Sequence, residues 1–222
     1  MRRFSILGVS LVDYTARESL RLADGYRRNG ALNTATYLTA QTLATASKDE
    51  RVKALVEDTD MTLCVEPDIL EAAGIANAGR VREIEERVFL KEFLKRLSRQ
   101  QDSIYVLGDT QQQAFALREM LLGQQENLNI VGCSGHDEFN SQQDRLMNAL
   151  NAAAPKVILS RMTWPVDLEL MHEGRKFLNA ELWLALPERK LPGKSRQTMV
   201  DRIRKKLFQK KVNEYNEEKA AQ

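Results

Sequence analysis

Two carboxylates near residue 66 are the first candidates for catalytic chemistry. Glu66 and Asp68 follow the apolar, β-rich run 61–65, so they lie just beyond a predicted strand. A carboxylate in such a place could act as a general base that removes the proton of a hydroxyl group. Asp68 also precedes a short helical segment, 69–73, where the helix dipole alone favours an acid. Both interpretations of Asp68 stay open.

A second candidate is the turn Gly108-Asp109-Thr110, which follows a buried-type strand and opens a helix. The amide groups at a helix amino terminus can receive a phosphate. Thr110 suits an anion, but the charge of Asp109 would repel one, so an ordinary capped helix is the favoured interpretation. Gly132 ends the next apolar run, and His136 follows in a polar turn. His136 could switch its charge near neutral pH, although helix capping by its neighbours explains this turn more simply.

Trp164 and Asp167 follow a later predicted strand and are candidates for substrate binding. The indole of Trp164 could stack on a base or a sugar, or it could simply close the pocket or pack against the edge of the sheet. The run 58–60 has the Asp-x-Asp form of a metal–nucleotide site. It precedes a strand instead of ending one, however, and would lie at the wrong edge of a parallel sheet. We therefore reject it as a site.

Metal and disulfide chemistry have little support in the sequence. The two histidines and the two cysteines, Cys64 and Cys133, lack the spacing of a zinc site. Two distant cysteines in a cytoplasmic protein are expected to be reduced thiols. We therefore expect no metal and no cofactor.

The candidate turns need a scaffold that brings them together. Short β-rich runs alternate with longer segments of helical period, the pattern of βαβ units. The predicted strands are 4–9, 61–65, 104–108, 128–132, 156–159 and 181–186. The predicted helices are 15–29, 40–47, 50–57, 81–99 and 166–177, with others after residues 108 and 132. We expect an α/β fold with a Rossmann-like parallel sheet flanked by helices, whose ligands bind at the carboxyl ends of the strands.

The composition is that of an ordinary water-soluble globular protein. Of the 222 residues, 43% are hydrophobic and 29% are charged. No apolar run approaches the ~20 residues that span a bilayer. Polar residues at 13–15 interrupt the first apolar run, so a signal peptide is not expected. We predict a cytoplasmic protein with an α/β domain over residues 1–190 and a helical tail over 191–222.

The predicted tail is basic and amphipathic. The segment 189–211 holds ten lysines and arginines but one acid, so the rest of the chain has a net negative charge. Ile203 and Leu207 lie on an apolar stripe of the tail. Basic residues beside this stripe include Arg204, Lys205 and Lys206. Such a helix is typical of a segment that binds an anionic membrane surface. Docking of the stripe on the domain or on a second subunit is an equal alternative, whereas nucleic acid is disfavoured because few aromatic residues are interleaved.

Several segments, taken in order, resemble one known family. The segment 6–18, which opens with Ile-Leu-Gly-Val, is similar to the opening pattern of the family. The segment 40–49 is similar to the helix that follows the family's Thr-x-Asn motif. The Tyr-Val-Leu-Gly turn in 105–114 and the Ile-Val-Gly at 130–132 are similar to two later glycine turns. Over about residues 4–186 the chain resembles the bacterial WecG/TagA/CpsF glycosyltransferases.

The resemblance implies a reaction and a location. Members of this family transfer an N-acetylated amino sugar, typically from a UDP donor, to a lipid-linked acceptor in cell-wall or surface-polysaccharide synthesis. An active member would be a metal-independent inverting transferase, here with Glu66 or Asp68 as the base. The family's carboxy-terminal appendage implies a position on the inner face of the membrane.

The departures from the family pattern indicate impaired catalysis. Where the family has its Thr-x-Asn motif, this chain has Tyr37-Leu38-Thr39, so Tyr37 and Thr39 stand at the two named positions of the motif. The Pro-Asp-Gly that holds the family's proposed base falls on 64–66, Pro-x-Gln-Glu falls on 165–168, and Gly-Gly-x-Phe-Asp is replaced by 186–189. We expect a glycosyltransferase-like protein with impaired catalysis. The alternative is a non-catalytic binding or regulatory subunit, either as a homo-oligomer or with an active relative.

Overall fold

A six-stranded parallel sheet forms the centre of the protein. The computed structural model describes residues 1–139, 142–187 and 199–220. The strand order is β4-β3-β8-β7-β5-β6, and every neighbouring pair is parallel. The strands are β3 (Asn33–Leu38), β4 (Met61–Cys64), β5 (Ile104–Gly108), β6 (Ile130–Gly135), β7 (Val157–Arg161) and β8 (Leu182–Ala185). The predicted α/β fold is therefore confirmed.

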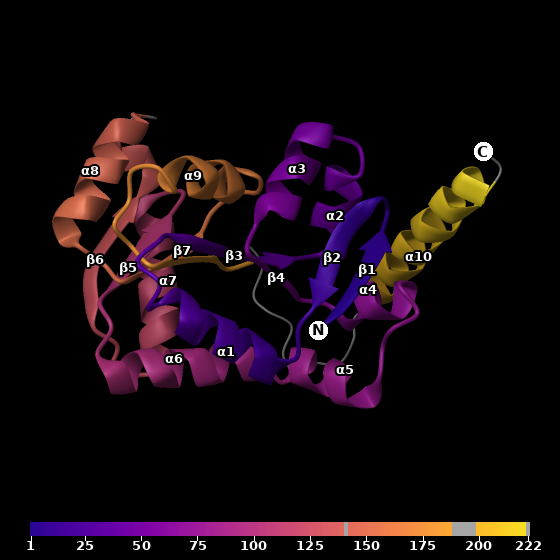
Figure 1. Cartoon of the computed structure of the whole chain (residues 1–222), viewed down its shortest axis with the longest axis horizontal. Coiled ribbons are helices and arrows are strands. Elements are labelled where there is room, and N and C mark those ends of the chain that lie inside the picture. The colour runs from indigo at the N-terminus through magenta and orange to yellow at the C-terminus, as the bar shows by residue number, and fades with distance from the viewer. Residues whose placement is uncertain (140–141, 188–198, 221–222) are drawn as a thin grey trace.

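Helices cover both faces of this sheet (Figure 1). One face packs against α1 (Ala16–Tyr26), α6 (Val88–Gln100) and α7 (Gln111–Gln124). The other face packs against α2 (Ala40–Ala46), α3 (Glu50–Asp58), α8 (Gln143–Ala153) and α9 (Val166–Gly174). Two short helices, α4 (Pro67–Ala72) and α5 (Ala78–Glu85), connect β4 to α6.

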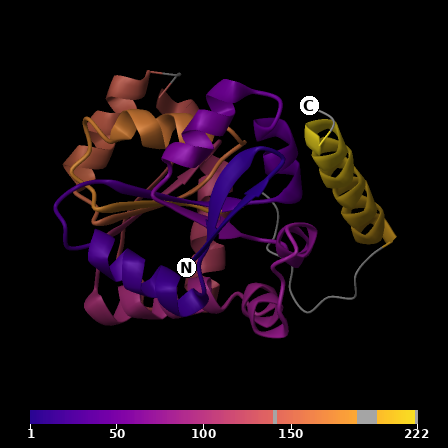
Figure 2. The ribbon, with the colours of Figure 1, turned by 45° about the vertical axis from the view of Figure 1, so that its right-hand side comes forward.

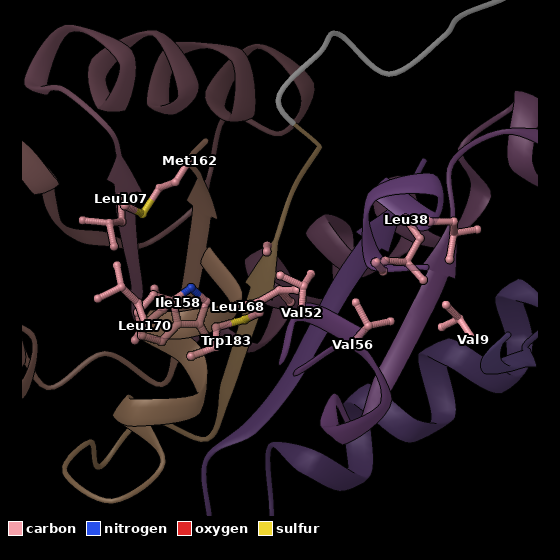
Figure 3. Packing of buried hydrophobic residues seen from close by; sticks show 14 of the residues in the cluster. Val9, Leu38, Val52, Val56, Leu107, Ile158, Met162, Leu168, Leu170 and Trp183 are labelled. Carbon is pink, nitrogen blue, oxygen red and sulfur yellow. The ribbon is translucent and has the colours of Figure 1, made fainter. Parts of the chain in front are cut away.

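Each face of the sheet has its own hydrophobic core. Figure 3 shows part of the core on the α9 side, where Ile158 and Trp183 lie close together. Val157 and Leu159, the neighbours of Ile158 in β7, belong to the core on the α6 side. Successive side chains of a strand point to opposite faces, so a strand that is covered on both faces is apolar at every position. This explains the continuous apolar runs in the sequence.

The predicted first strand, 4–9, is correct only for residues 4–6, which lie in β1 (Arg2–Ile6), and its bounds and its place in the fold differ from the prediction. The chain forms an antiparallel hairpin of β1 and β2 (Val9–Asp13), separate from the main sheet. Leu7 and Gly8 turn the chain between these strands, with φ angles of 51° and 76°. Positive φ at both central residues is the geometry of a tight hairpin turn.

The sequence pattern missed β3, a central strand. Its threonines interrupt the apolar run, but Thr34 and Thr36 are buried. Distant residues satisfy Thr34: Asp60 accepts from its amide at 2.8 Å, and Arg175 donates to its hydroxyl at 2.6 Å. Asp60 immediately precedes β4, so it lies at the amino edge of the sheet. This is the edge opposite the one where parallel sheets bind ligands, which agrees with the rejection of the run 58–60 as a metal–nucleotide site.

Two other predicted boundaries also differ. The predicted helix 81–99 is two helices, α5 and α6, because the chain breaks at Arg87, which has a left-handed φ of 55°. The predicted strand 128–132 is displaced toward the carboxyl end of the chain, because β6 begins at Ile130 and continues to Gly135.

The helix of the tail, α10 (Met199–Ala220), packs against the domain beside α4 and α2 (Figures 1 and 2). Phe208 and Val212 are buried in the core on the α9 side. Ile203 and Leu207, on another side of the helix, are 48% and 56% exposed. The predicted boundary between residues 190 and 191 lies outside the described residues. Within the described part of the chain, no helix is long and apolar enough to cross a membrane.

Candidate functional site

The carboxyl ends of the parallel strands share one edge of the sheet, where such folds bind ligands. Thr39 and Glu66 follow β3 and β4, and Asp109 follows β5. Trp164 and Asp167 follow β7. Most of the candidate residues therefore lie along this edge, which we call the carboxyl edge.

Val65 and Glu66 follow the last residue of β4. Val65 is 5% exposed and packs in the core on the α6 side. The Glu66 carboxylate accepts a hydrogen bond of 2.9 Å from the amide of Ala40, the first residue of α2. The first amides of a helix have no partner within the helix, so Glu66 satisfies one of them. This carboxylate thus holds two strand ends together.

Asp68 lies in the first turn of α4, as the helix-dipole interpretation expects. It also forms an ion pair with Lys205 of the tail helix, with 3.2 Å between Nζ and Oδ1. Glu71 contacts the same ammonium group. The hydrogen bond that Lys205 donates to Glu71 raises the pKa of this lysine, and the one that it donates to Asp68 adds to the rise. Asp68 is therefore part of the contact between the domain and the tail.

Tyr37 and Thr39 have different environments. The ring of Tyr37 lies on the α6 side, with its centroid 6.5 Å from that of Phe89. Thr39 caps α2: its hydroxyl accepts from the Thr42 amide at 3.0 Å, and the Thr42 hydroxyl accepts from the Thr39 amide. Tyr37 is therefore available to line a site, whereas Thr39 stabilises a helix end.

A pocket opens on the α6 side of β3 and β4. Its polar lining includes Tyr14, Tyr37, Arg80, Glu83 and Arg87. Asp13 fixes Arg80, with 2.7 Å between Nη2 and Oδ1, and Glu83 contacts the same guanidinium. Cys64 also lines the pocket, and burial raises the pKa of its thiol to about 12. A thiol with such a pKa stays protonated and is a poor nucleophile at neutral pH.

The turn at Gly108 has the geometry of a capped helix. Thr110 and Gln113 form a reciprocal capping box at the start of α7. A Cβ on Gly108 would lie 2.6 Å from the amide nitrogen of Ala114, so α7 packs directly on the end of β5. Asp109 accepts from the amide and the hydroxyl of Thr163, at 2.9 and 2.8 Å. These contacts agree with the simpler of the two interpretations of this turn.

Gly132 lies within β6, whereas His136 lies in the turn that follows this strand. Gly132 is inside the strand, where a Cβ would lie 2.2 Å from the ring of Tyr105. Its position therefore has a packing explanation. His136 is half-buried and opens the short 3₁₀ helix His136–Phe139 beyond the strand. The amide of Asp137 in this helix donates to the carbonyl of Asp109 at 3.0 Å.

Asp167 is the most perturbed acid at the carboxyl edge. It is 3% exposed, and its Oδ2 accepts from the Met162 amide at 3.2 Å. Burial raises the pKa of its carboxyl group to about 7; hydrogen bonds from Ser160 and Met162 oppose this rise, and the charge of Asp109 adds to it. The Oδ1 atom is buried without a partner, as is the Nε1 atom of Trp164. The turn after β7 thus holds an unpartnered acceptor and an unpartnered donor.

Comparison with known proteins identifies the family. The model of the Glycosyl transferase WecG/TagA/CpsF family matches residues 4–186, which is most of the chain. This chain belongs to the WecG/TagA/CpsF family. No curated protein sequence matches it. In the described part of this WecG/TagA/CpsF protein, no three His, Cys, Asp or Glu side chains cluster as metal ligands.

The departures from the WecG/TagA/CpsF pattern can now be located in space. Val65, which we predict to stand at the place of the family's proposed base, is a buried hydrocarbon side chain. Asp167, in the run that we predict to correspond to the Pro-x-Gln-Glu element, is buried at the start of α9. Leu186 and Pro187 follow β8, but residues 188 and 189 lie outside the described residues.

Two arginines of this WecG/TagA/CpsF protein were not predicted as site residues. Arg161 is the last residue of β7, and Arg87 immediately precedes α6. A signal for Arg161 was present in the sequence, because a basic residue directly follows the buried run 157–160. No local pattern marks Arg87, whose position depends on the break between two helices.

Proposed function

We propose that this protein binds a nucleoside-diphosphate amino sugar but transfers it slowly or not at all. The substrates that the family implies are a UDP-linked N-acetylated amino sugar and a lipid-linked acceptor. The observation that carries the proposal is the end of β4. There a buried valine stands at the place of the base, and the nearest carboxylates, Glu66 and Asp68, already have partners.

Neither carboxylate can act as a base without a rearrangement. A general base must come within hydrogen-bond reach of the hydroxyl group that it deprotonates. If Glu66 turned toward an acceptor, the amide of Ala40 would lose the hydrogen bond that it donates to this carboxylate. Asp68 would have to separate from Lys205, and it lies three residues beyond the position of the family's base. These costs support impaired catalysis.

Calorimetric titration with UDP and with UDP-linked N-acetylated amino sugars tests the proposal. We expect the wild type and a Glu66→Ala/Asp68→Ala double variant to bind these ligands alike, and neither to release UDP above the uncatalysed rate. Sugar transfer by the wild type that the double variant loses would show an active enzyme with a substitute base. Folded protein that binds none of the ligands would exclude a donor site and favour a regulatory subunit, alone as a homo-oligomer or with an active relative.

The tail supports a second proposal, that the protein binds the inner face of the membrane. Phe208 and Val212 attach α10 to the domain, whereas Ile203 and Leu207 remain exposed on a different side. The exposed basic residues of the same helix include Arg202, Arg204, Lys206, Lys210 and Lys211. An apolar strip bordered by cations is the surface that an anionic bilayer binds.

We expect an Ile203→Ser/Leu207→Ser variant to bind phosphatidylserine vesicles at least roughly tenfold more weakly than the wild type, because it loses the side chains that enter the bilayer. Vesicle sedimentation measures this binding. A Gln209→Ser/Asn213→Ser variant changes two exposed polar residues of the same helix and is the matched control. Equal binding by both variants would contradict the proposal.

A further inference from the structure

The strand β6 forms an open edge of the main sheet. It is the last strand in the order, and Figure 1 shows it at the end of the sheet far from the hairpin. Ile130 pairs with Ile104 and Gly132 pairs with Tyr105, so Val131 is an extra residue that forms a bulge. A bulge on an edge strand hinders the addition of a further strand.

The side chain of Gln111 also hinders strand addition at this edge. Its amide group donates to the Cys133 carbonyl at 3.4 Å, and its oxygen accepts from the Gly135 amide at 2.7 Å. Two backbone groups of the edge strand are therefore already satisfied. An extended peptide that adds to a sheet needs free backbone groups. A partner of this edge would instead contact side chains.

The helix beside this edge, α7, has apolar residues on two of its sides. Its buried residues, which face the sheet, are Ala114, Leu117 and Leu121. Phe115 lies on another side of the helix and is 49% exposed, and Val131 of the adjacent β6 is 42% exposed. A helix that is apolar beyond the stripe facing its own core has a second surface to cover.

Arg118 and Glu119 add opposite charges to the same surface. They lie one helical turn beyond Phe115, and their side chains form an exposed ion pair of 2.7 Å. Burial raises the pKa of the Cys133 thiol, the charge of Arg118 lowers it, and the charge of Glu119 raises it, so both groups lie near β6. We call Phe115, Arg118, Glu119 and Val131 the α7–β6 patch.

The charges of the α7–β6 patch are complementary to themselves. About a two-fold axis, the same patch meets itself, so Arg118 of one copy can face Glu119 of the other, and the reverse contact forms as well. A partner of a single charge would be repelled by one of these two groups. The patch therefore fits a second copy of this chain better than a uniformly acidic or basic partner.

We propose that two copies of this protein associate weakly through their α7–β6 patches. Phe115 and Val131 become buried in the contact, and the two charged groups pair across it. The proposal goes beyond the proposed function, since it uses neither the carboxyl edge nor the tail. Because few large apolar side chains take part, dilute protein stays monomeric, and unfolding measurements on dilute protein report the single chain.

Sedimentation equilibrium of the full chain over a wide concentration range tests this contact. We expect a reversible monomer–dimer equilibrium in the wild type. Phe115→Ser/Val131→Ser is expected to weaken dimerisation at least about tenfold, because it removes the apolar area of the contact. Phe177→Ser changes an equally accessible phenylalanine, 62% exposed, in the segment after α9 and is the matched control.

A charge exchange tests the two-fold geometry. Arg118→Glu and Glu119→Arg are each expected to weaken dimerisation, because each places like charges across the axis. An equal mixture of these two variants is expected to dimerise again, since opposite charges then meet between the chains. The pair within one chain cannot produce this result, because both residues of each variant carry the same charge.

Three outcomes would overturn the proposal. The first is wild-type protein that stays monomeric at every concentration. The second is a dimer that Phe115→Ser/Val131→Ser leaves unchanged. The third is a dimer that only Ile203→Ser/Leu207→Ser weakens, which would place the contact on the tail. The substituted side chains of the patch are exposed or only partly buried, so the variants are expected to fold, and thermal melting checks this.

Discussion

At about pH 8, replacing Asp167 with asparagine is expected to raise the free energy of unfolding by up to about 4 kcal/mol. The carboxyl group is buried, and burial raises its pKa from 3.8 to about 7. An ionised carboxylate at this place costs desolvation energy that asparagine does not incur. Asparagine also keeps an oxygen that can accept from the Met162 amide.

The sign of the pH dependence follows from the raised pKa. The folded protein holds the Asp167 proton more tightly than the unfolded chain does. The contribution to stability is complete below the unfolded-state pKa of 3.8 and is lost as the pH rises toward about 7. Above that pH it stays lost. The carboxyl group therefore destabilises the fold at neutral and alkaline pH.

Urea unfolding at about pH 4 and about pH 8 measures this contribution. The advantage of Asp167→Asn over the wild type is expected to be small at the lower pH and large at the higher pH. Asp144→Asn changes an exposed aspartate of α8 and is the control for general effects of charge. If the free energy of unfolding has the same pH dependence in the wild type and in Asp167→Asn, the pKa of the Asp167 carboxyl group is not raised in the folded protein.

Asp102→Ala is expected to lower the free energy of unfolding by about 3–5 kcal/mol, because it leaves a buried arginine without its counter-ion. Arg27 and Asp102 are 2% and 5% exposed and form an ion pair at the amino edge of the sheet. Lys156 approaches the other oxygen of Asp102 at 3.1 Å, and Gln100 accepts from Arg27 at 2.8 Å. These contacts join α1, the end of α6 and the start of β7.

Denaturant unfolding with a matched surface pair checks this prediction. Glu119→Ala breaks the exposed Arg118–Glu119 pair and is expected to cost only about 0–1 kcal/mol. An Arg27→Met/Asp102→Leu variant removes both buried charges and is expected to recover much of the lost stability. A loss from Asp102→Ala no larger than that from Glu119→Ala would contradict the role assigned to the buried cluster.

Local pattern was sufficient for a large part of this protein. The strands β5 and β7 were predictable because strands covered on both faces carry apolar residues without interruption. The start of α1 was predictable because a capping box depends on residues three apart, and Thr15 and Glu18 form it. The order of such segments also identified the family, since the matches follow one another along the chain.

Contacts between distant residues decided the rest. β3 is a buried strand because Asp60 and Arg175 satisfy its polar groups, and no pattern within the strand shows those partners. The partner of Asp68 is Lys205 of the tail, far along the chain. Whether a carboxylate is a free base or half of an ion pair depends on which charges lie within a few ångströms. That proximity is set by the packing of whole elements, so the chemistry of this edge follows from the tertiary structure.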